Sequence, residues 1–503
     1  MSVRKVSREF PVTMERDVVV VGGGTAGLVA AIAAARNGAR TLILESSGAL
    51  GGMMTNGGVD SFHTFRISWD VSRMHQNEDT STEQVIKGIP QEILERLKEI
   101  GGAYIGKPYV RKGEATYRHA YDGELLKLLA DQMCEEAGVD VLYQTYIVDP
   151  IMEEKTVKGV TFVNKSGKGA ALAKVVIDAT GDGDVAASAG APFEMGDPET
   201  GFGMPLTLQI WVGGVDFRKT TEFMLEENPD NADAKWLEKN VELFRKGHPV
   251  CYYNEFRNLL AEAYRNGDIT VPPGAHGFGK FGTSTVFRDG RVPDGIARYG
   301  GIDMAYRVDP TRAEDLTKAW MYARKRVFEI LNFFRKYVPG HENAYVLFTF
   351  PMIGVRVSRR IIGDYTITAD DFLEGRMFPD NIARCGRALN VHPTLGFKFD
   401  EKKGVETEEE FTPLRTWTES KKAFGIPYRA LLPKGIGDVL VVGRCISCDW
   451  QVQGSIRGQP ACMATGQAAG TAAAIAVRDK VSPRSLDVER LQEVLREQGA
   501  DIG

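Results

Sequence analysis

The sequence predicts an α/β protein: a discontinuous Rossmann-like domain into which an α+β domain is inserted. An apolar strand at 17–21 enters a glycine-rich turn and a helix of small residues, and a second strand follows at 40–44. Two further short apolar runs, at 174–178 and 438–442, lead into glycine-containing turns, as buried parallel strands do. The long stretch between these two runs is expected to be the insertion.

The turn after the first strand has the spacing of a phosphate-binding turn. Gly22 lets the chain leave the strand tightly, Gly24 lets backbone N–H groups approach a pyrophosphate, and Gly27 lets the helix pack on the sheet. Glu45 stands about twenty residues later, where a carboxylate binds ribose hydroxyls and repels a 2′-phosphate. This unit predicts a bound dinucleotide, held by Gly22, Gly24, Thr25, Ala26, Gly27 and Glu45.

The same glycine spacing occurs again at 277–282. This second copy follows Pro272, Pro273 and Gly274 instead of a buried strand. A glycine motif without its strand and helix lacks the structural context that phosphate binding requires. We therefore interpret the second copy as a loop.

A glycine-rich stretch at 46–58 bears on which dinucleotide is bound. Two pairs of glycines, 51–52 and 57–58, can expose backbone along a cofactor that extends beyond its pyrophosphate to an aromatic ring. The second strand of a simple nicotinamide dehydrogenase is followed by an ordinary polar loop, so this stretch favours FAD over NAD. A flexible surface loop is the alternative interpretation. The FAD contacts expected in this stretch are Ser46, Gly51, Gly52 and Met53.

Several later stretches carry a resemblance to a known family. Residues 174–187, which contain Ala179-Thr180-Gly181, resemble the "ATG" strand and turn of flavoproteins with the glutathione-reductase fold. The other matching stretches are 354–364, 426–434, 438–447 and 454–470. Their order resembles that of the bacterial FAD-dependent oxidoreductases, relatives of the succinate dehydrogenase flavoprotein, from about residue 15 to 480. The resemblance implies a bound FAD, with further contacts at Val148, Ala179, Thr180, Gly181, Asp184, Gly443, Arg444 and Ser455.

The helix expected at about 460–477 consists almost entirely of Ala, Gly, Thr and Met. A helix of small residues can lie close to a flavin ring, and the dipole at its N-terminus can stabilise negative charge on the reduced ring. Plain helix propensity and tight packing are the alternative explanation of this composition.

The domain boundaries follow from the positions of these motifs. A helical pattern at 122–137 closed by Gly138, a strand at 139–143 and a hairpin at 165–168 support the middle segment. The expected division is 15–60, 115–190 and 425–480 for the FAD-binding domain, 191–424 with 61–114 as a smaller excursion for the substrate or cap domain, 1–14 for an N-terminal arm, and 481–503 for a C-terminal helix or tail. A ligand cleft is expected at the domain boundary, over the flavin.

Composition restricts the partners and the compartment. The 503 residues, 43% of them hydrophobic, suffice for two or three domains. A net charge of −5 with both signs interspersed argues against nucleic-acid binding. The N-terminus lacks the apolar core of a signal peptide, and no apolar window is long enough for membrane insertion, so we expect a cytoplasmic protein. The expected partners are a small-molecule substrate and an unidentified electron acceptor, with homo-oligomer formation left open.

The six cysteines, at 134, 251, 385, 445, 448 and 462, are too dispersed for a secreted disulfide framework. Cys445 and Cys448 alone have suggestive spacing. Cys445 follows a strand instead of starting a helix, which favours buried thiols over a redox pair. The family commonly has Cys445 alone, so Cys448 is a departure from its pattern. No metal site is predicted.

Two family-matched side chains of the inserted domain are candidates for catalysis. His392 can act as a general base on a hydroxyl or amine, and Arg356 can hold a carboxylate in a fork. The family usually has glutamate at the position of Val357, so its mechanism does not transfer directly. In the competing interpretation His392 only orders a loop, and three arginines pair with three nearby aspartates: Arg356, Arg359 and Arg360 with Asp364, Asp370 and Asp371.

FAD is expected to be bound noncovalently. The histidine that binds flavin covalently in succinate dehydrogenase flavoproteins falls at the level of residues 50–52, where this chain has none. His63 could reach the flavin ring, whereas His119 and His276 are expected to be hydrogen-bonding loop residues. A flavin-containing electron-transfer subunit or a non-catalytic carrier is the second class of function. Direct use of NAD(P)H is disfavoured because the chain has no second complete nucleotide turn.

Overall fold

The computed structural model describes residues 9–503 except 64, 66, 68–82, 106–108, 112–113, 117, 227–251, 254–255, 271–280, 284–294, 300–303, 393, 395–396, 401–404 and 409–421. Most of the second glycine copy, His276 and Cys251 lie outside the described residues, as do the side chains of His63 and His119.

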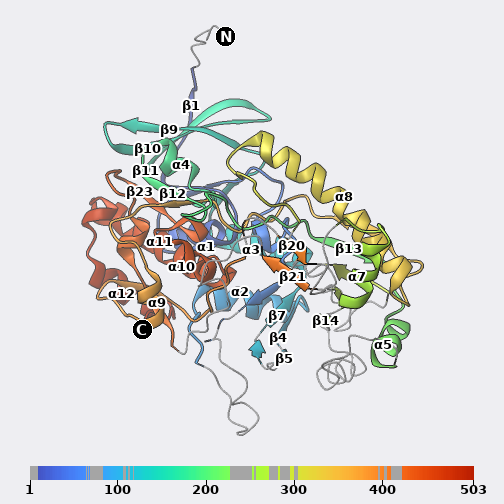
Figure 1. Cartoon of the computed structure of the whole chain (residues 1–503). Helices are drawn as coiled ribbons and strands as arrows, with labels where there is room; N and C mark the ends of the chain where they lie inside the picture. Colours follow the sequence, from blue (N-terminus) through green and yellow to red (C-terminus); the bar gives the residue numbers. More distant parts are fainter. Residues whose placement is uncertain are drawn as a thin grey trace.

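A seven-stranded sheet forms the centre of the molecule (Figure 1). Its parallel strands follow the order β8 (Asp140–Leu142), β2 (Thr41–Leu44), β1 (Val12–Val21) and β11 (Gly167–Asp178), and β23 (Val439–Val441) pairs with β11. Two antiparallel strands, β10 (Thr156–Asn164) and β9 (Tyr146–Glu153), extend the sheet beyond the first half of β11. The predicted hairpin at 165–168 is confirmed.

The strand register brings the functional turns to one edge of this sheet. Val21 pairs with Leu44 on one side and with Asp178 on the other, and Asp178 pairs with Val441. The residues that follow these four strand ends therefore leave the sheet side by side. β1 begins at Val12, earlier than the predicted residue 17, because the long β11 offers partners as far back as Ala170. The strand thus extends into the predicted N-terminal arm.

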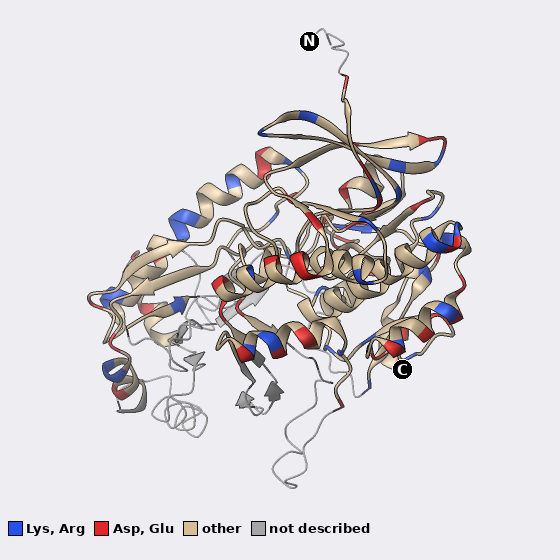
Figure 2. Ribbon diagram, turned by 180° about the vertical axis from the view of Figure 1, so that it is seen from behind, with Lys and Arg blue, Asp and Glu red and all other residues tan. Residues whose placement is uncertain are grey.

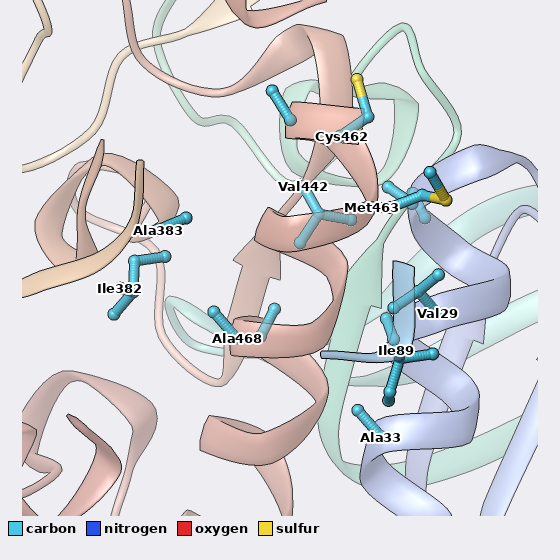
Figure 3. Close-up of a cluster of buried hydrophobic side chains, with 14 of the residues drawn as sticks. Val29, Ala33, Ile89, Ile382, Ala383, Val442, Cys462, Met463 and Ala468 are labelled. Carbon is cyan, nitrogen blue, oxygen red and sulfur yellow. The ribbon is translucent and has the colours of Figure 1, made fainter. Parts of the chain in front are cut away.

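Two helices of small residues lie side by side (Figure 3). A Cβ atom on Gly466 of α11 (Gln459–Asp479) would lie 2.2 Å from the carbonyl oxygen of Ala26 in α1 (Thr25–Arg36), and one on Gly470 would lie 2.1 Å from that of Ala30. Only glycine permits this approach. At Gly466 and Gly470 the small residues of α11 therefore serve close helix packing, while the position of its N-terminus beside the flavin stays a prediction.

Further helices and strands complete the main core. α3 (Gly123–Ala137) is capped by Asp122 and ends at Gly138, which has a φ of +75°, as predicted. Residues 367–389, which we assigned to the inserted domain, share the core of α1 and α11. The other elements here are α2 (Ile89–Glu99), α9 (Ala369–Glu374), α10 (Trp450–Ile456), α12 (Val488–Glu497), and the strands β19 (Asn381–Cys385) and β22 (Phe424–Pro427).

The inserted region forms a second core. Its sheet has the order β14 (Tyr252–Tyr253), β15 (Phe281–Thr283), β16 (Ala297–Tyr299), β13 (Ile210–Gly213) and β17 (Tyr345–Thr349). The long helix α8 (Ala313–Tyr337) shares this core with alternate residues of the sheet. We call this five-stranded sheet the cap sheet. The α/β fold with additional helices agrees with the predicted fold class, whereas the exact domain boundaries stay a prediction.

The remaining described elements are short. They are α4 (Asp184–Ser188), α5 (Phe217–Glu226), α7 (Arg257–Arg265), and the strands β3 (Ser61–His63), β4 (Ala103–Ile105), β5 (Tyr109–Arg111), β6 (Glu114–Thr116), β7 (Arg118–Tyr121), β12 (Phe193–Met195), β18 (Arg359–Ile361), β20 (Phe397–Asp400) and β21 (Val405–Glu408). Charges of both signs are interspersed over the described helices and strands (Figure 2). None of the described helices is long and apolar enough to cross a membrane.

Candidate functional site

The glycines of the predicted phosphate turn differ in the space available for a side chain. Gly22 has a φ of +95°, and a Cβ atom there would lie 2.6 Å from the carbonyl oxygen of Ala179. A Cβ atom on Gly27 would lie 1.8 Å from the carbonyl oxygen of Gly22. Gly24 differs, because a Cβ atom there would have no heavy atom within 4 Å. Gly22 and Gly27 are thus required by the fold, and Gly24 faces open space.

The N-terminus of α1 is suited to an anion. Gly24 is its N-cap residue, and no side chain caps the first-turn N–H groups. By contrast, Asp122 accepts hydrogen bonds from two N–H groups of α3. Uncapped N–H groups beside open space provide what a pyrophosphate requires. The turn therefore fits the dinucleotide that its spacing predicts.

Glu45 is buried and organises the turn from the neighbouring strand. One carboxylate oxygen accepts the N–H of Gly23 at 2.7 Å, and the other accepts the N–H of Ser47 at 2.7 Å and the hydroxyl of Ser46 at 3.3 Å. A carboxylate has about four acceptor positions. With three positions used, Glu45 can hold the turn and still accept a ribose hydroxyl. Gly23 was not among the predicted site residues, although it lies within the motif.

The first glycine pair of the stretch 46–58 lies directly against the phosphate turn. The N–H of Gly51 donates to the carbonyl of Gly23 at 2.8 Å, and the hydroxyl of Thr25 donates to the carbonyl of Gly51 at 3.4 Å. A Cβ atom on Gly52 would lie 2.9 Å from Cα of Gly24. This stretch therefore leaves the phosphate turn as a defined backbone path, consistent with a cofactor longer than its pyrophosphate.

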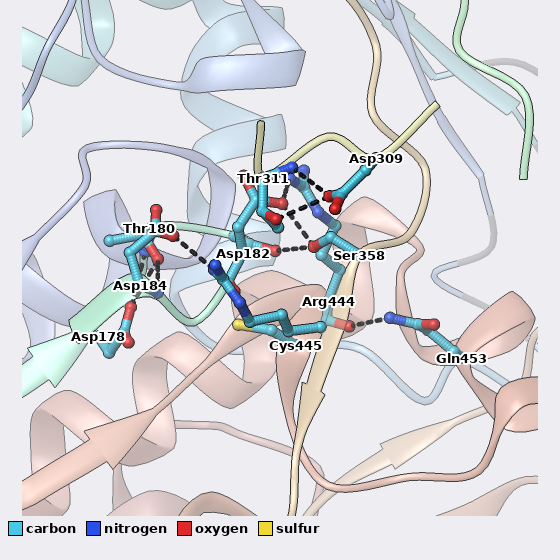
Figure 4. A network of polar contacts seen from close by, with 12 residues as sticks. Asp178, Thr180, Asp182, Asp184, Asp309, Thr311, Ser358, Arg444, Cys445 and Gln453 are labelled. Atoms are coloured by element: carbon cyan, nitrogen blue, oxygen red, sulfur yellow. Dashed lines mark hydrogen bonds and ion pairs between the residues drawn. The ribbon is translucent and has the colours of Figure 1, made fainter. Parts of the chain in front are cut away.

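The "ATG" turn is held together by a buried carboxylate (Figure 4). Asp178, fully buried at the end of β11, accepts the N–H and hydroxyl of Thr180 at 3.1 and 2.7 Å and the N–H of Ala186 at 2.9 Å. Burial raises its pKa to about 6, against the hydrogen bonds, which favour the charged form.

The shifted pKa of Asp178 predicts a pH dependence of stability. The folded state binds the proton more tightly than the unfolded state, so the stability contribution of Asp178 falls as pH rises from about 4 to about 6. Relative to Asp178→Asn, the FAD-free wild type is expected to lose about 3 kcal/mol over this window. Urea unfolding of both proteins at several pH values measures the difference. A difference that does not change with pH would contradict the prediction.

An arginine from the far end of the chain closes this turn. The guanidinium of Arg444 donates to Asp182 at 2.7 Å and lies close to Gly181, and the hydroxyl of Ser358 also donates to Asp182 (Figure 4). Asp184 forms an ion pair with Arg359 at 2.7 Å. The predicted contacts Gly181, Asp184 and Arg444 therefore lie in one network. The carboxylate of Asp184 is paired within it, whereas the buried Nε of Arg444 has no hydrogen-bond partner among the described residues.

Gly443 and Ser455, two predicted FAD contacts that follow β23, differ from each other in their surroundings. Gly443, with a φ of +80°, follows β23 and lies next to Ala26 of α1. The hydroxyl of Ser455 donates to the carbonyl of Arg387 at 2.5 Å and is fully buried. Ala179 and Thr180 follow β11 at the same sheet edge. Gly443 is therefore well placed beside the phosphate turn, whereas Ser455 has its hydroxyl engaged elsewhere.

Val148 lies on β9, and its side chain is exposed. The chain comes closest to Glu45 a few residues earlier, where the N–H of Thr145 donates to the carbonyl of Glu45 at 2.9 Å and that of Gln144 donates to Ser47 at 3.0 Å. Within residues 144–148, the backbone of residues 144 and 145 therefore contacts the residues at the end of β2.

The remainder of the glycine-rich stretch lies along the inserted region. We call this contact, between residues 53–60 and residues 350–354, the loop–cap seam. The two segments run in opposite directions. Met53 lies beside Gly354, where an added Cβ atom would be 3.2 Å from the methyl carbon of Met53. The carbonyl of Asn56 accepts the N–H of Met352 at 3.1 Å, and Gly58 lies against the ring of Phe350. The seam joins the cap sheet to the stretch expected to contact the flavin.

A buried ion pair closes one end of the seam. Asp60 and Arg298 of β16 form a salt bridge, and they are 3% and 8% exposed. Burial lowers the pKa of Arg298 to about 10, so the guanidinium stays charged at neutral pH. The hydroxyl of Tyr121 and the amide of Gln459 both donate to the carbonyl of Val59. The sequence contained no signal for this pair, because its members are 238 residues apart.

The structure brings the two catalytic candidates into neighbouring segments. Val357, next to Arg356, and Val391, next to His392, pack together with Met204 and Trp450. The guanidinium of Arg356 donates to the carbonyl of Pro205, and His392 is 8% exposed. Because residues 350–356 continue from the loop–cap seam, Arg356 lies just beyond its Met53 end.

For Arg359 and Arg360 the competing arginine–aspartate pairing is wrong. Among the described residues, Arg359 pairs with Asp184 and Arg360 pairs with Glu194. Asp364 instead pairs with Arg484, and Asp371 with Arg376. β18 carries Arg359 and Arg360 away from these aspartates because it pairs with β12.

The cysteines among the described residues are free thiols and are all buried: Cys134, Cys385, Cys445, Cys448 and Cys462. Burial raises the pKa of each. A thiol with a raised pKa has little of the reactive thiolate at neutral pH. Buried structural thiols are therefore favoured over a redox pair at 445 and 448. Among the described residues, no group of three or more His, Cys, Asp or Glu could hold a metal ion.

The thiol assignment predicts slow alkylation. In the folded protein at pH 8, peptides containing Cys445 and Cys448 are expected to stay unmodified by iodoacetamide over an hour, because both thiols are protonated and inaccessible. Both should react fully in urea, which mass spectrometry of the digested peptides measures. Rapid native labelling of Cys445 would contradict the assignment.

Comparison with known proteins identifies the family. The chain matches the FAD dependent oxidoreductase family over residues 17–495. It is 34% identical over 123 residues to a dihydrolipoyl dehydrogenase of Trypanosoma brucei brucei, covering 23% of this chain and 25% of that protein. It is 33% identical over 147 residues to a thiamine thiazole synthase of Aeropyrum pernix, covering 29% of this chain and 43% of that protein. These matches span less than half the length of either curated relative.

Two solved structures are similar to this one over most of their length. A geranylgeranyl bacteriochlorophyll reductase-like protein from Thermoplasma acidophilum has 14% identity and a TM-score of 0.45, covering 97% of this chain and 84% of that chain. The p-nitrophenol 4-monooxygenase of Pseudomonas putida has 12% identity and a TM-score of 0.43, covering 97% and 88%. From the family match over nearly the whole chain, this protein belongs to the FAD dependent oxidoreductase family, and it is an FAD-dependent enzyme of that family.

Proposed function

We propose that this enzyme is a dehydrogenase or reductase that transfers a hydride or electrons between a small polar metabolite and N5 of FAD, and that a separate acceptor exchanges electrons with the flavin. The observation that carries the proposal is the loop–cap seam, with Arg356 and His392 in neighbouring segments just beyond it. The inserted region thus places candidate polar groups beside the stretch expected to contact the flavin.

The cofactor has a proposed set of protein contacts. The turn at Gly22–Gly27 holds the pyrophosphate, Glu45 holds the ribose, and the backbone at 51–53, 179–184 and 443–444 holds the remainder. When bound, FAD supplies the hydride or electron transfer itself. FAD is held noncovalently, because residues 50–52 contain no histidine.

The protein then supplies orientation and proton transfer. The guanidinium of Arg356 can hold a substrate carboxylate with two parallel hydrogen bonds. The imidazole of His392 can accept a proton from a substrate hydroxyl or amine as the substrate is oxidised. His392 is buried, which limits competing water. Both residues are proposed in these roles.

Two variants test these roles. His392→Asn is expected to slow flavin reduction by a metabolite substrate about 100-fold, since a general base contributes about that much, with an unchanged flavin spectrum. Arg356→Met is expected to raise KM more than it lowers kcat. Anaerobic stopped-flow absorbance at the flavin band measures both, and exposed Arg490→Met serves as control. Wild-type turnover in His392→Asn would remove the base assignment.

The same measurement separates other functions. Flavin that is never reduced by a metabolite alone, but is reduced when a partner protein is added, would favour an electron-transfer subunit. Flavin that is never reduced would favour a non-catalytic carrier. Rapid bleaching by NADH alone would contradict the expectation that the chain does not use NAD(P)H directly.

A further inference from the structure

One face of the cap sheet is aromatic. Trp211 pairs with Arg298 on one side and with Phe348 on the other, so these three side chains share a face. Phe350 lies on the same face, because its ring centroid is 5.9 Å from that of Trp211 and 5.0 Å from that of Phe348. The Trp211 and Phe348 centroids are 5.1 Å apart. We call these three rings, with Gln209, the aromatic face.

The aromatic face leads from solvent to the loop–cap seam. Phe348 is 41% exposed, Phe350 is 7% exposed, and Gln209 is 5% exposed. Phe350 contacts Gly58 of the seam, and its N–H donates to the carbonyl of Gln209 at 3.2 Å. A small molecule could therefore contact the aromatic face from exposed Phe348 to buried Phe350.

Two polar atoms at the inner end of this face have no hydrogen-bond partner among the described residues. They are Oε1 of Gln209 and the indole N–H of Trp211, and both atoms are buried. Leu208, Ile210 and Val212 belong to the second core, so Gln209 and Trp211, which alternate with them along the chain, share the opposite face. Buried polar atoms in folded proteins are nearly always bonded. One unsatisfied acceptor and one unsatisfied donor match a ligand group that both donates and accepts.

We propose that the aromatic face binds a hydroxylated aromatic ring, such as a phenol or hydroquinone. The ring lies against Trp211 and Phe350, while the hydroxyl donates to Gln209 and accepts from the indole N–H of Trp211. This assignment rests on the proposed function, since it places the ring at the seam beside the flavin stretch. The hydroxylated ring is either the reductant or the product that forms when its quinone, as the electron acceptor, takes up two electrons and two protons.

Binding to the holoenzyme tests the site independently of turnover. Isothermal titration calorimetry with 2-naphthol is expected to show binding at least tenfold tighter than with 2-methoxynaphthalene, which cannot donate. Gln209→Met should weaken 2-naphthol binding at least tenfold, and so should Trp211→Phe. If the wild type binds both compounds equally or neither, the assignment fails, while the metabolite assays of the proposed function are unaffected.

Stability distinguishes a ligand-binding glutamine from a structural one. Gln209→Met removes an unbonded buried carbonyl, so the unfolding midpoint of the FAD-free protein should stay the same or rise. The control, Gln492→Met, removes a buried amide that donates to two carbonyls at 2.8 and 2.9 Å. The control should lower the midpoint and leave 2-naphthol binding unchanged. A lowered midpoint with unchanged binding in Gln209→Met would overturn the proposal.

Two redox assays distinguish whether the ring compound reduces the flavin or reoxidises it. Bleaching of the flavin by 1,4-dihydroxynaphthalene without oxygen identifies a reductant site, because the diol passes two electrons and one proton to the flavin and its second proton to solvent as it becomes 1,4-naphthoquinone. Reoxidation of dithionite-reduced enzyme by 1,4-naphthoquinone identifies an acceptor site. Either reaction, lost in Gln209→Met, supports the proposal. If neither occurs, the ring does not reach the flavin and the assignment is overturned.

Discussion

Replacement of Gly24 by aspartate is expected to stabilise the FAD-free protein and to abolish FAD binding at micromolar concentration. A side chain at this position meets no heavy atom within 4 Å, and the backbone φ of −71° suits an N-cap residue. The new carboxylate should accept the first-turn N–H groups of α1, which stabilises a helix by about 1 kcal/mol. It would then occupy the anion position with negative charge. We expect FAD affinity to fall by at least about a thousandfold, or about 4 kcal/mol.

Two further variants make this experiment specific. Gly24→Asn has the same shape without the charge, so it should keep the helix cap and lose less affinity than Gly24→Asp. Gly27→Ala should behave differently, because its Cβ atom would lie 1.8 Å from a carbonyl oxygen and would destabilise the fold itself. Thermal unfolding of the FAD-free proteins and a fluorescence titration with FAD provide both quantities. Gly24→Asp protein that purifies with a full complement of FAD would refute the pyrophosphate assignment.

Removal of the Arg298 charge is expected to cost about 3–5 kcal/mol of stability, the range seen when one partner of a buried pair is lost. Arg298→Met retains most of the side-chain volume but leaves the carboxylate of Asp60, 3% exposed, without its guanidinium. Since this pair joins β16 to the loop–cap seam, the loss should also weaken FAD binding. Urea unfolding with and without FAD measures both effects.

The double variant Asp60→Asn/Arg298→Met should recover a large part of the lost stability, because it no longer buries a carboxylate that has lost its guanidinium. Exposed Arg490→Met, which removes a surface pair with Glu493, should change stability by less than about 1 kcal/mol. A single variant Arg298→Met that is as stable as Arg490→Met would show that the buried pair does not hold the cap sheet in place.

Local motifs made the nucleotide-binding unit predictable. A tight turn, a close helix approach and an acidic strand end each require particular residue types at fixed spacing. The structure accordingly has Gly22, Gly27 and Glu45 where the pattern indicated. The helix at 460–477 was predicted as an element, but its main partner was not, because the backbone of α1 becomes its neighbour only after the sheet forms.

Contacts within the inserted region were much less predictable. Arg359 pairs with Asp184 and not with a nearby aspartate, because strand pairing with β12 sets its direction. Asp60 and Arg298 meet across 238 residues, and neither occurs in a recognisable pattern. Single charged residues carry no information about distant partners until topology brings them together.

By itself, the sequence determined the βαβ unit and its cofactor class, because short-range geometry restricts glycine and carboxylate positions tightly. Only the tertiary structure decided how the cap sheet meets the stretch at 53–60, which arginine neutralises Asp60, and which polar atoms of Gln209 and Trp211 stay unsatisfied. These features depend on packing between segments hundreds of residues apart, and residue order alone does not encode that packing in any local pattern.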